Sequence, residues 1–262
     1  MRIHPTAIVD ERAQLGAEVE IGPFSIIGAE AIIGEKCVMQ SHVVIEGPVQ
    51  MGASNLIGHG AIIGAAPQYL GFQAQTKSRV EIGNANVIRE YCTIHRGATE
   101  GSATALGDGN FIMVGVHVGH DCRIGNGVVI TNNSLLAGYV RVDDRAVIGG
   151  GTRFHQSIRI GRLVMAEGEF WKNIPPFLIA GRNHVFGVNI IGLRRAGFSA
   201  ADRDEIKRAF KLLYKSGLNT SQACEKAAEL EFSPVGREFF DFVANAGKRG
   251  IVPYSANAVG ED

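Results

Sequence analysis

Two histidines and an aspartate stand close together in the stretch VHVGHD, residues 116–121. His117 and His120 are three positions apart, and Asp121 follows His120 directly. An imidazole titrates near neutral pH, so it can accept and return a proton during a reaction, while a carboxylate can orient it and stabilise its charged form. Neighbouring residues of an extended strand point to opposite sides, so His120 and Asp121 can pair only where the chain turns. The stretch indicates acid–base chemistry at a turn.

Other kinds of site find less support. The spacing HxxH can hold zinc on a helix or beside a third ligand, but no cluster of cysteines or carboxylates supplies one. Neither a GxSxG motif nor a P-loop occurs, and no serine adjoins His117 or His120. We therefore expect no metal site and no bound cofactor, and His120 acts as a general base for direct attack by a substrate. The alternative for any single histidine is a polar side chain that only decorates the surface.

A six-residue period determines where these side chains lie. Aliphatic residues recur at every sixth position from Ile3 to Ile63, and the pattern resumes from Ile82 to Ile160. Glycine often follows the aliphatic residue, which accounts for the 34 glycines of the chain. A helix repeats every 3.6 residues and a strand every two, so a period of six indicates three short strands in each coil of a triangular all-β solenoid. The aliphatic side chains point inward. So do three of the four cysteines, which we interpret as reduced packing residues: Cys37, Cys92 and Cys122.

The period is interrupted twice, and it ends before the C-terminus. We predict exposed loops at residues 65–80 and 98–105, and loops that interrupt a rigid repeat commonly carry function. Residues 1–190 are assigned to the solenoid and residues 191–262 to a small α-helical domain. Helices are expected to open at Ser199, whose partner Asp202 completes a capping box, at Thr220 and at Ser233. The tail from about residue 253 is expected to be mobile.

Coils of eighteen residues predict which polar side chains share an edge. Tyr139 falls one coil beyond the corner of His120, and His155 falls about two coils away. We expect these side chains, with His117, to form an exposed strip along one edge of the solenoid.

The charge balance limits the partners of the protein. The chain has 26 Lys and Arg against 26 Asp and Glu, so no general attraction draws it to nucleic acid or to an anionic membrane. An anionic partner must be held by a local patch. No apolar run approaches the roughly 18 residues that span a bilayer, and charged residues interrupt the first sixteen positions, where a signal peptide would be apolar. We expect a cytoplasmic protein that binds no nucleic acid and does not insert into membranes.

Several motifs together resemble one enzyme family. In order and spacing, IHPTAIV, IGPFSIIG, TIHRG, VGHDCRIG, FHQ and FGVNIIGLRRAGF are similar to segments of the UDP-N-acetylglucosamine O-acyltransferases that begin lipid A synthesis. The resemblance extends over nearly the whole chain to Ile251. It implies a left-handed parallel β-helix of hexapeptide repeats and a homotrimer with active sites between neighbouring solenoids. It also implies transfer of a 3-hydroxyacyl group from acyl carrier protein to the sugar 3-hydroxyl, with the carrier thioester as co-substrate and no cofactor.

The resemblance assigns roles to particular residues. His120 matches the catalytic base, Asp121 would hold its imidazole, and the backbone N–H of Gly138 matches the oxyanion donor. Six further positions match contacts to the nucleotide sugar or the acyl chain: Gln68, His117, His155, Gln156, Asn189 and Arg195. For Arg195, a solvated position at the entry to the helical domain is an equal alternative. Four basic residues could form the patch that an acidic carrier protein needs: Lys207, Arg208, Lys211 and Lys215.

The sequence also departs from the family at polar positions. Tyr69, Gly71, Tyr139 and Ile191 replace residues expected to be charged or to be histidine, and Ala196 replaces an arginine. Three hypotheses follow. The protein is an O-acyltransferase of the family, or it acylates a 3-amino UDP-sugar to form an amide, or it is a trimeric binding paralogue without turnover.

Overall fold

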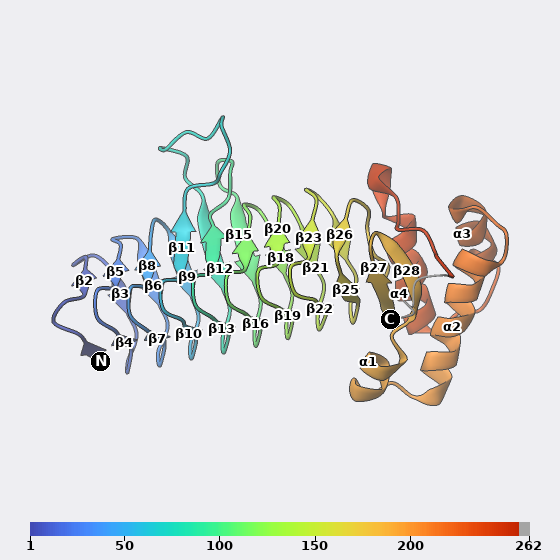
Figure 1. Cartoon of the computed structure of the whole chain (residues 1–262), viewed down its shortest axis with the longest axis horizontal. Helices are drawn as coiled ribbons and strands as arrows, with labels where there is room; N and C mark the ends of the chain where they lie inside the picture. Colours follow the sequence, from blue (N-terminus) through green and yellow to red (C-terminus); the bar gives the residue numbers. More distant parts are fainter. Residues whose placement is uncertain (257–262) are drawn as a thin grey trace.

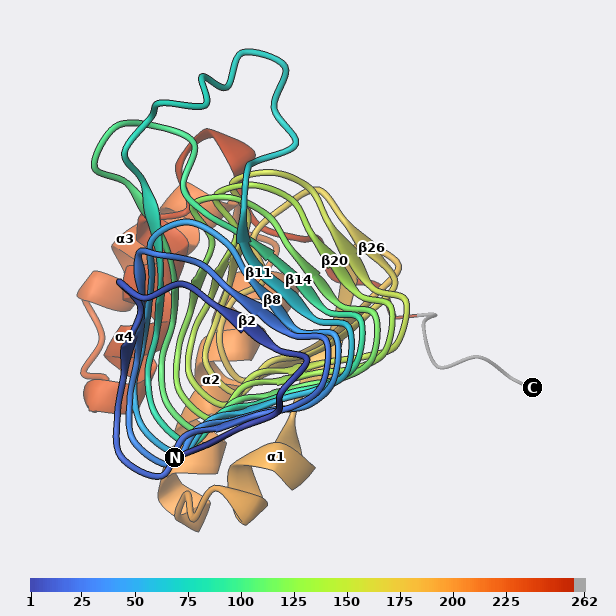
Figure 2. The same cartoon turned by 90° about the vertical axis from the view of Figure 1, so that its left-hand side faces the viewer.

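The computed structural model describes residues 1–256 and shows a column of short parallel strands with helices at its C-terminal end (Figure 1). Each coil up to β24 contributes one strand to each of three sheets, and the column is triangular when viewed along its length (Figure 2). The predicted all-β solenoid with a small α-helical C-terminal part is confirmed.

The three sheets are named A, B and C. Sheet A contains β1 (Arg2–Ile3), β4 (Glu20–Ile21), β7 (Val38–Met39), β10 (Leu56–Ile57), β13 (Val87–Ile88), β16 (Phe111–Ile112), β19 (Val129–Ile130), β22 (Val147–Ile148), β25 (Met165–Glu167), β27 (Leu178–Gly181) and β28 (His184–Val188). Sheet B contains β2 (Ile8–Val9), β5 (Ile26–Ile27), β8 (Val44–Ile45), β11 (Ile62–Ala65), β14 (Thr93–His95), β17 (His117–Val118), β20 (Leu135–Leu136), β23 (Arg153–Phe154) and β26 (Glu169–Phe170). Sheet C contains β3 (Gln14–Leu15), β6 (Ala31–Ile33), β9 (Val49–Met51), β12 (Arg79–Ile82), β15 (Ala103–Leu106), β18 (Arg123–Ile124), β21 (Arg141–Val142) and β24 (Arg159–Ile160).

The interior of the column is built from the aliphatic residue of each hexad. Regular coils pair residues eighteen positions apart, as in Glu20 with Val38, so that equivalent side chains stack directly on one another. Ile57, Ile88 and Ile112 are completely buried. The three cysteines predicted to point inward are buried as well, which confirms that part of the prediction: Cys37, Cys92 and Cys122.

The outward residues differ between the sheets. On sheet A the outward row starts with Arg2 and Glu20 and is then apolar and only partly covered, with Val38, Leu56, Val87, Phe111, Val129, Val147 and Met165. Sheet B begins in the same way with Ile8, Ile26, Val44 and Ile62. On sheet C the outward row is mostly polar, with Gln14, Gln50, Glu81, Arg123, Arg141 and Arg159.

Two insertions leave the column at the corner between sheets B and C (Figure 2). Leu56 pairs with Val87, 31 positions on instead of 18, because residues 66–78 loop out between β11 and β12. The second insertion occupies residues 96–102, between β14 and β15. It is shorter than the predicted loop at 98–105. Residues 103–105 lack the usual aliphatic pattern, yet they form parallel pairs with β12 and belong to β15.

The helices follow a hairpin at the end of the column. β28 runs antiparallel to β27, and the chain then forms α1 (Ile190–Arg195), α2 (Ala200–Lys215), α3 (Thr220–Ala228), α4 (Pro234–Ala244) and the short 3-10 helix η1 (Gly247–Arg249). Ser199 and Asp202 form the predicted capping box of α2. Helices also begin near Thr220 and Ser233 as expected, whereas the short α1 was not predicted.

The described residues after η1 are hydrogen-bonded to the rest of the chain. The N–H of Val185 donates to the carbonyl oxygen of Pro253, and the N–H of Ser255 donates to that of Val185. The prediction of a mobile tail from residue 253 is therefore wrong for residues 253–255, because this segment pairs with β28. Residues 257–262 lie outside the described part of the chain. Within residues 1–256, no helix is both long and apolar enough to cross a membrane.

Candidate active site

His120 and Asp121 lie on the corner between β17 and β18, at the edge where the two inserted loops leave the column. Asp121 has a φ of +60°, so the chain turns there and both side chains reach the same side. The Nδ1 atom of His120 lies 2.8 Å from Oδ2 of Asp121. The side chains are 18% and 7% exposed, respectively, so the pair is sheltered but open to a substrate. The turn that this pairing requires is present.

The 96–102 loop holds the carboxylate of Asp121. The N–H of Ala98 donates to Oδ2 at 3.0 Å, and Ser102 also donates a hydrogen bond. Burial alone would raise the pKa of Asp121, but the hydrogen bonds from Ser102, His120 and Ala98 outweigh it and lower the pKa below its usual value. An ionised carboxylate accepts a hydrogen bond, so the proton of a neutral His120 sits on Nδ1. The lone pair of Nε2 then remains available to remove a proton from a substrate.

Gly138, one coil away, lies against the imidazole of His120. A Cβ atom at this position would come within 2.5 Å of both Cε1 and Nε2 of the ring. Only glycine therefore leaves the ring in place. Among the described residues, the Gly138 N–H donates no hydrogen bond, so it is free to contact a bound group. The free N–H lies on the residue that touches Nε2, where a reacting oxygen would be placed.

Two further histidines lie beside this pair and are half-buried or buried. Nδ1 of His117 lies 2.8 Å from Oγ1 of Thr93, and the ring packs edge-on against His95 at 4.8 Å between centroids. Burial lowers the pKa of His117 to about 4 and also lowers that of His95, so both are neutral near pH 7. The expectation that His117 and His120 are exposed is wrong, because neighbouring coils and loops cover them. His95 was not among the candidate residues, although the motif TIHRG contains it.

Two tyrosines complete the surroundings of His120. The ring of Tyr139 packs edge-on against the imidazole, with 5.1 Å between the ring centroids. The ring centroid of Tyr69 lies 6.4 Å from that of His120. Burial, and then the nearby charge of Asp121, raise the pKa of the Tyr139 phenol. Tyr69 belongs to the 66–78 loop, which Arg96 anchors through hydrogen bonds to the carbonyl oxygens of Thr76 and Ala74. The long loop therefore reaches the site of its own chain.

The remaining predicted contacts lie elsewhere. Gln68 is exposed in the 66–78 loop, and His155 and Gln156 are exposed about two coils beyond His120. Asn189 is 8% exposed, and its amide is occupied: Oδ1 accepts from the N–H of Gly192 as the cap of α1, and Nδ2 donates to the carbonyl oxygen of Leu163. This argues against Asn189 as a free ligand. Arg195 is exposed at the end of α1, past β20, β23 and β26, the strands that follow β17 in sheet B.

No metal centre accompanies this arrangement in the described residues. Within residues 1–256, no group of three or more His, Cys, Asp or Glu side chains is placed to hold an ion. The groups that the site brings together are a base with a free nitrogen, a carboxylate that supports its charge, and a free backbone N–H beside it.

The same column occurs in solved structures of acyltransferases. A UDP-N-acetylglucosamine acyltransferase from Bacteroides fragilis is 40% identical, with a TM-score of 0.90 over 95% of this chain and 99% of its own. The chain belongs to this acyltransferase family. The acyltransferase is also similar to the enzymes from Moraxella catarrhalis, at 36% identity and a TM-score of 0.91 over 96% of this chain and 100% of the other, and from Francisella novicida, at 33% and 0.91 over 99% and 100%.

Two family descriptions match parts of the acyltransferase. Residues 103–138 match the bacterial transferase hexapeptide repeats, and residues 173–252 match the second domain of the UDP N-acetylglucosamine O-acyltransferases. The first match spans the His120 corner and Gly138. The resemblance seen in the sequence motifs, the enzyme class and the left-handed parallel β-helix are confirmed.

Proposed function

We propose that this acyltransferase moves a 3-hydroxyacyl chain from acyl carrier protein to the 3-hydroxyl of UDP-N-acetylglucosamine, the first step of lipid A biosynthesis. The observation that carries the proposal is the His120–Asp121 pair, whose free Nε2 lies against Gly138 and its free N–H. These groups supply a base, support for its positive charge and an oxyanion donor, which together are what acyl transfer to a hydroxyl requires.

The groups act in sequence. Nε2 of His120 removes the proton from the sugar hydroxyl while its oxygen attacks the carbonyl carbon of the thioester. The imidazolium that forms is stabilised by the ionised Asp121, and the negative oxygen of the tetrahedral intermediate is stabilised by the Gly138 N–H. The intermediate then expels the thiolate of the carrier protein, which takes the proton back from His120. The products are the sugar ester and the free thiol, and the base is restored.

The proposal includes a homotrimer with active sites between chains. The outward apolar row of sheet A favours it, because a neighbouring solenoid would remove Phe111, Val147 and Met165 from water. Leu70, in the 66–78 loop, is fully exposed and would also be covered by a neighbour. Arg195 is the kind of residue that a second chain would supply, since its guanidinium suits a diphosphate and no contact joins it to His120 of its own chain.

The second candidate acceptor is a 3-amino UDP-sugar, which the same groups would acylate to an amide. Tyr69 and Tyr139 favour an altered acceptor site, because both rings lie next to His120 where more polar residues were expected. The intact His120–Asp121 pair argues against a paralogue that only binds.

One assay tests these alternatives. The purified protein is given a 3-hydroxyacyl carrier protein with UDP-N-acetylglucosamine or with its 3-amino analogue, and the products are identified by mass spectrometry and by their lability to mild base. We expect a base-labile ester from the hydroxyl sugar. A stable amide formed at a higher kcat/KM would replace the proposed acceptor, and no transfer to either sugar by folded trimer would refute the proposal.

A further inference from the structure

Three arginines lie in register on the outward face of sheet C. Arg123 pairs with Arg141, and Arg141 pairs with Arg159, in adjacent parallel strands. Strands of a sheet are about 4.8 Å apart, so three positive side chains leave the column one above another. Like charges at directly opposed positions destabilise a sheet unless other groups neutralise them. We call this row the arginine ladder.

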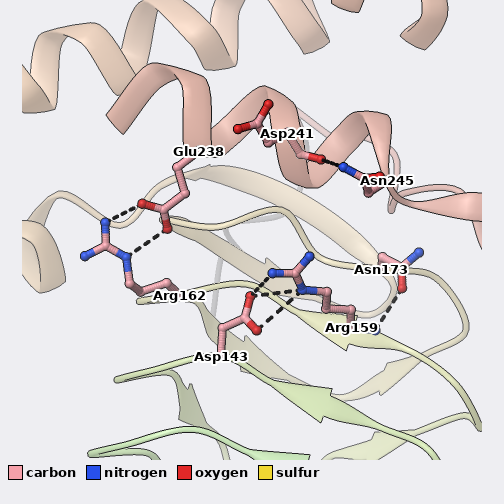
Figure 3. Close-up of polar contacts among 7 residues, drawn as sticks. All are labelled: Asp143, Arg159, Arg162, Asn173, Glu238, Asp241 and Asn245. Atoms are coloured by element: carbon pink, nitrogen blue, oxygen red, sulfur yellow. Dashed lines mark hydrogen bonds and ion pairs between the residues drawn. The ribbon is translucent and has the colours of Figure 1, made fainter. Parts of the chain in front are cut away.

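Only the last residue of the arginine ladder is neutralised by its own chain. Nη2 of Arg159 lies 2.8 Å from Oδ2 of Asp143 (Figure 3). The guanidinium of Arg159 also lies over the ring of Phe242 on α4. Arg123 and Arg141 are exposed and make no ion pair or side-chain hydrogen bond within residues 1–256. Two positive charges at the solvent face are therefore left for a partner.

Several acids near the arginine ladder are paired with other groups, whereas Asp144 accepts hydrogen bonds only from Asn126 and Asp241 of α4 makes no ion pair within residues 1–256. Asp121 pairs with His120, and Glu81 pairs with Arg79 at 2.6 Å. Farther along, Glu238 of α4 pairs with Arg162 at 2.5 Å (Figure 3). None of these acids makes an ion pair with Arg123 or Arg141.

The three arginines of the ladder line a cleft that also reaches the corner of Asp121. The cleft has a volume of about 780 Å³, and its lining includes the corner residues Asp121, Tyr139 and Ser157. Phe242 and Asn245 of α4 line it as well. Arg123 is two residues from Asp121. A partner held on the ladder would thus lie directly beside the site where the thioester must arrive.

The basic residues of α2 are a weaker alternative for such a partner. Lys207 pairs with Asp204, Arg208 lies over Phe232 and pairs with Glu205, and Lys215 lies over Phe210 and Tyr254. Only Lys211 of this group makes no such contact among the described residues. Sheet C also differs from most of sheet A and from the first four strands of sheet B, whose outward residues are apolar and suited to burial between chains. Its polar face suits a partner that arrives from solvent.

We propose that Arg123 and Arg141 form a docking surface for the acidic face of the carrier protein that delivers the thioester to His120. The inference rests on the proposed function, because it takes the carrier protein as donor. Charge complementarity selects the occupant: two uncompensated guanidinium groups attract carboxylates, and such contacts raise association rates and affinity at low salt.

The test replaces both arginines in the full-length protein, as R123Q/R141Q. We expect KM for the acylated carrier protein to rise at least tenfold, while kcat and KM for the sugar nucleotide stay within twofold. The salt dependence of kcat/KM should become shallower, because fewer charges meet at the interface. The control is Arg12→Gln, which removes one exposed arginine at the N-terminal end of the column and leaves all parameters unchanged.

A second donor distinguishes protein docking from recognition of a phosphate. With an acylated phosphopantetheine in place of the carrier protein, we expect R123Q/R141Q and the wild type to be equal. An equal loss with both donors would overturn the inference and assign the ladder to the phosphate. A raised KM for the sugar nucleotide, or dissociation of the oligomer in light scattering, would overturn it as well.

Direct binding separates this inference from the proposed function. Binding of holo-carrier protein to the wild type and to R123Q/R141Q is measured by calorimetry, which needs no turnover. Tenfold weaker binding to the variant supports the ladder even if no sugar is acylated, in which case only the proposed function fails. Normal transfer and equal binding by both proteins would overturn the ladder and leave the proposed function standing.

Discussion

The inward and outward residues of the same strands differ in burial and in side-chain type. In β18 the inward Ile124 is 4% exposed and stacks on Leu106 and Val142, while its neighbour Arg123 points to solvent. In β17 the inward Val118 is completely buried and its neighbour His117 belongs to the active-site cluster. Inward positions repeat one type of side chain through the column. Outward positions differ between sheets, being apolar along most of sheet A and cationic at β18, β21 and β24 of sheet C, and they include the candidate site residue His117.

Because of this difference, a residue that stabilises the fold can be directly followed or preceded in the chain by a residue that is available for function. Side chains of successive residues in a strand point to opposite faces, so a substitution at one position leaves the other face intact. The two roles meet only at corners. There the positive φ of Asp121 and the missing side chain of Gly138 are conditions of both the fold and the site.

The largest expected effect is the loss of the base at an outward corner. His120→Ala should lower kcat by about 10²- to 10⁴-fold, the usual contribution of a general base, because no other group lies at Nε2 to accept the proton. The melting temperature should stay unchanged. Steady-state kinetics and thermal melting test this, with His4→Ala in the first coil as control. Retention of more than a tenth of the activity would remove His120 from the role of base.

Adjacent residues of β18 offer the most direct test of the comparison itself. Ile124→Ala should lower the free energy of unfolding by about 2 to 5 kcal/mol, the cost of emptying a buried site in a packed core. Arg123→Ala should change it by less than about 0.5 kcal/mol, as exposed substitutions usually do. Chemical denaturation at one fixed protein concentration measures both. Equal effects would mean that the outward row also supports the fold.

The half-buried His117 should make the protein sensitive to acid. Its pKa is about 4 in the folded chain and about 6.5 when unfolded, so between these values only the unfolded state binds the proton. The contribution of His117 to the free energy of unfolding is therefore fully present above pH 6.5. It is lost as the pH drops to 4, where the free energy of unfolding is lower by about 3 kcal/mol. Denaturation at a series of pH values should show this loss in the wild type and a smaller one in His117→Gln. The exposed His155→Gln should keep the wild-type profile, and an unchanged profile in His117→Gln would contradict the assignment.

The smallest expected effect comes from adding one methyl group at the corner. Gly138→Ala places a Cβ atom 2.5 Å from the imidazole, so the ring of His120 must tilt and kcat should fall about tenfold, the cost of roughly 1.4 kcal/mol in the transition state. KM should change little. Gly150→Ala is the matched control, because the nearest atoms to its added carbon lie 3.7 Å away. Full activity in Gly138→Ala would show that the ring is not held by this contact.

The sequence predicted the column because the hexad pattern depends only on residues that are close together in the chain. A period of six with inward aliphatic residues determines the coil, and the burial of Cys37, Cys92 and Cys122 followed from their place in the hexad. The capping box at Ser199 was also visible, since it depends on two residues three positions apart. The short α1 was not, because its six residues carry too little periodicity to distinguish a helix from a loop.

The surroundings of the site depended on contacts that the hexad rule does not describe. The exposure of His117 was predicted wrongly because the rule places it outward, whereas His95 and Thr93 of the preceding coil cover it. The motif match placed Asn189 among substrate contacts, but the direction of its amide is set by the cap of α1 and by Leu163. Position in a motif does not determine which way a side chain is used.

The hairpin of β27 and β28 prevents further strands from adding to sheet A at the C-terminal end of the column. A stack of parallel in-register strands is the arrangement of an amyloid fibre, and its last strand presents unpaired backbone groups to any further copy. Here β28 covers that edge by turning back antiparallel on β27, and the segment at residues 253–255 then pairs with β28 in turn. The hairpin and the helices after it therefore act as a stop against end-to-end polymerisation at this end of the column.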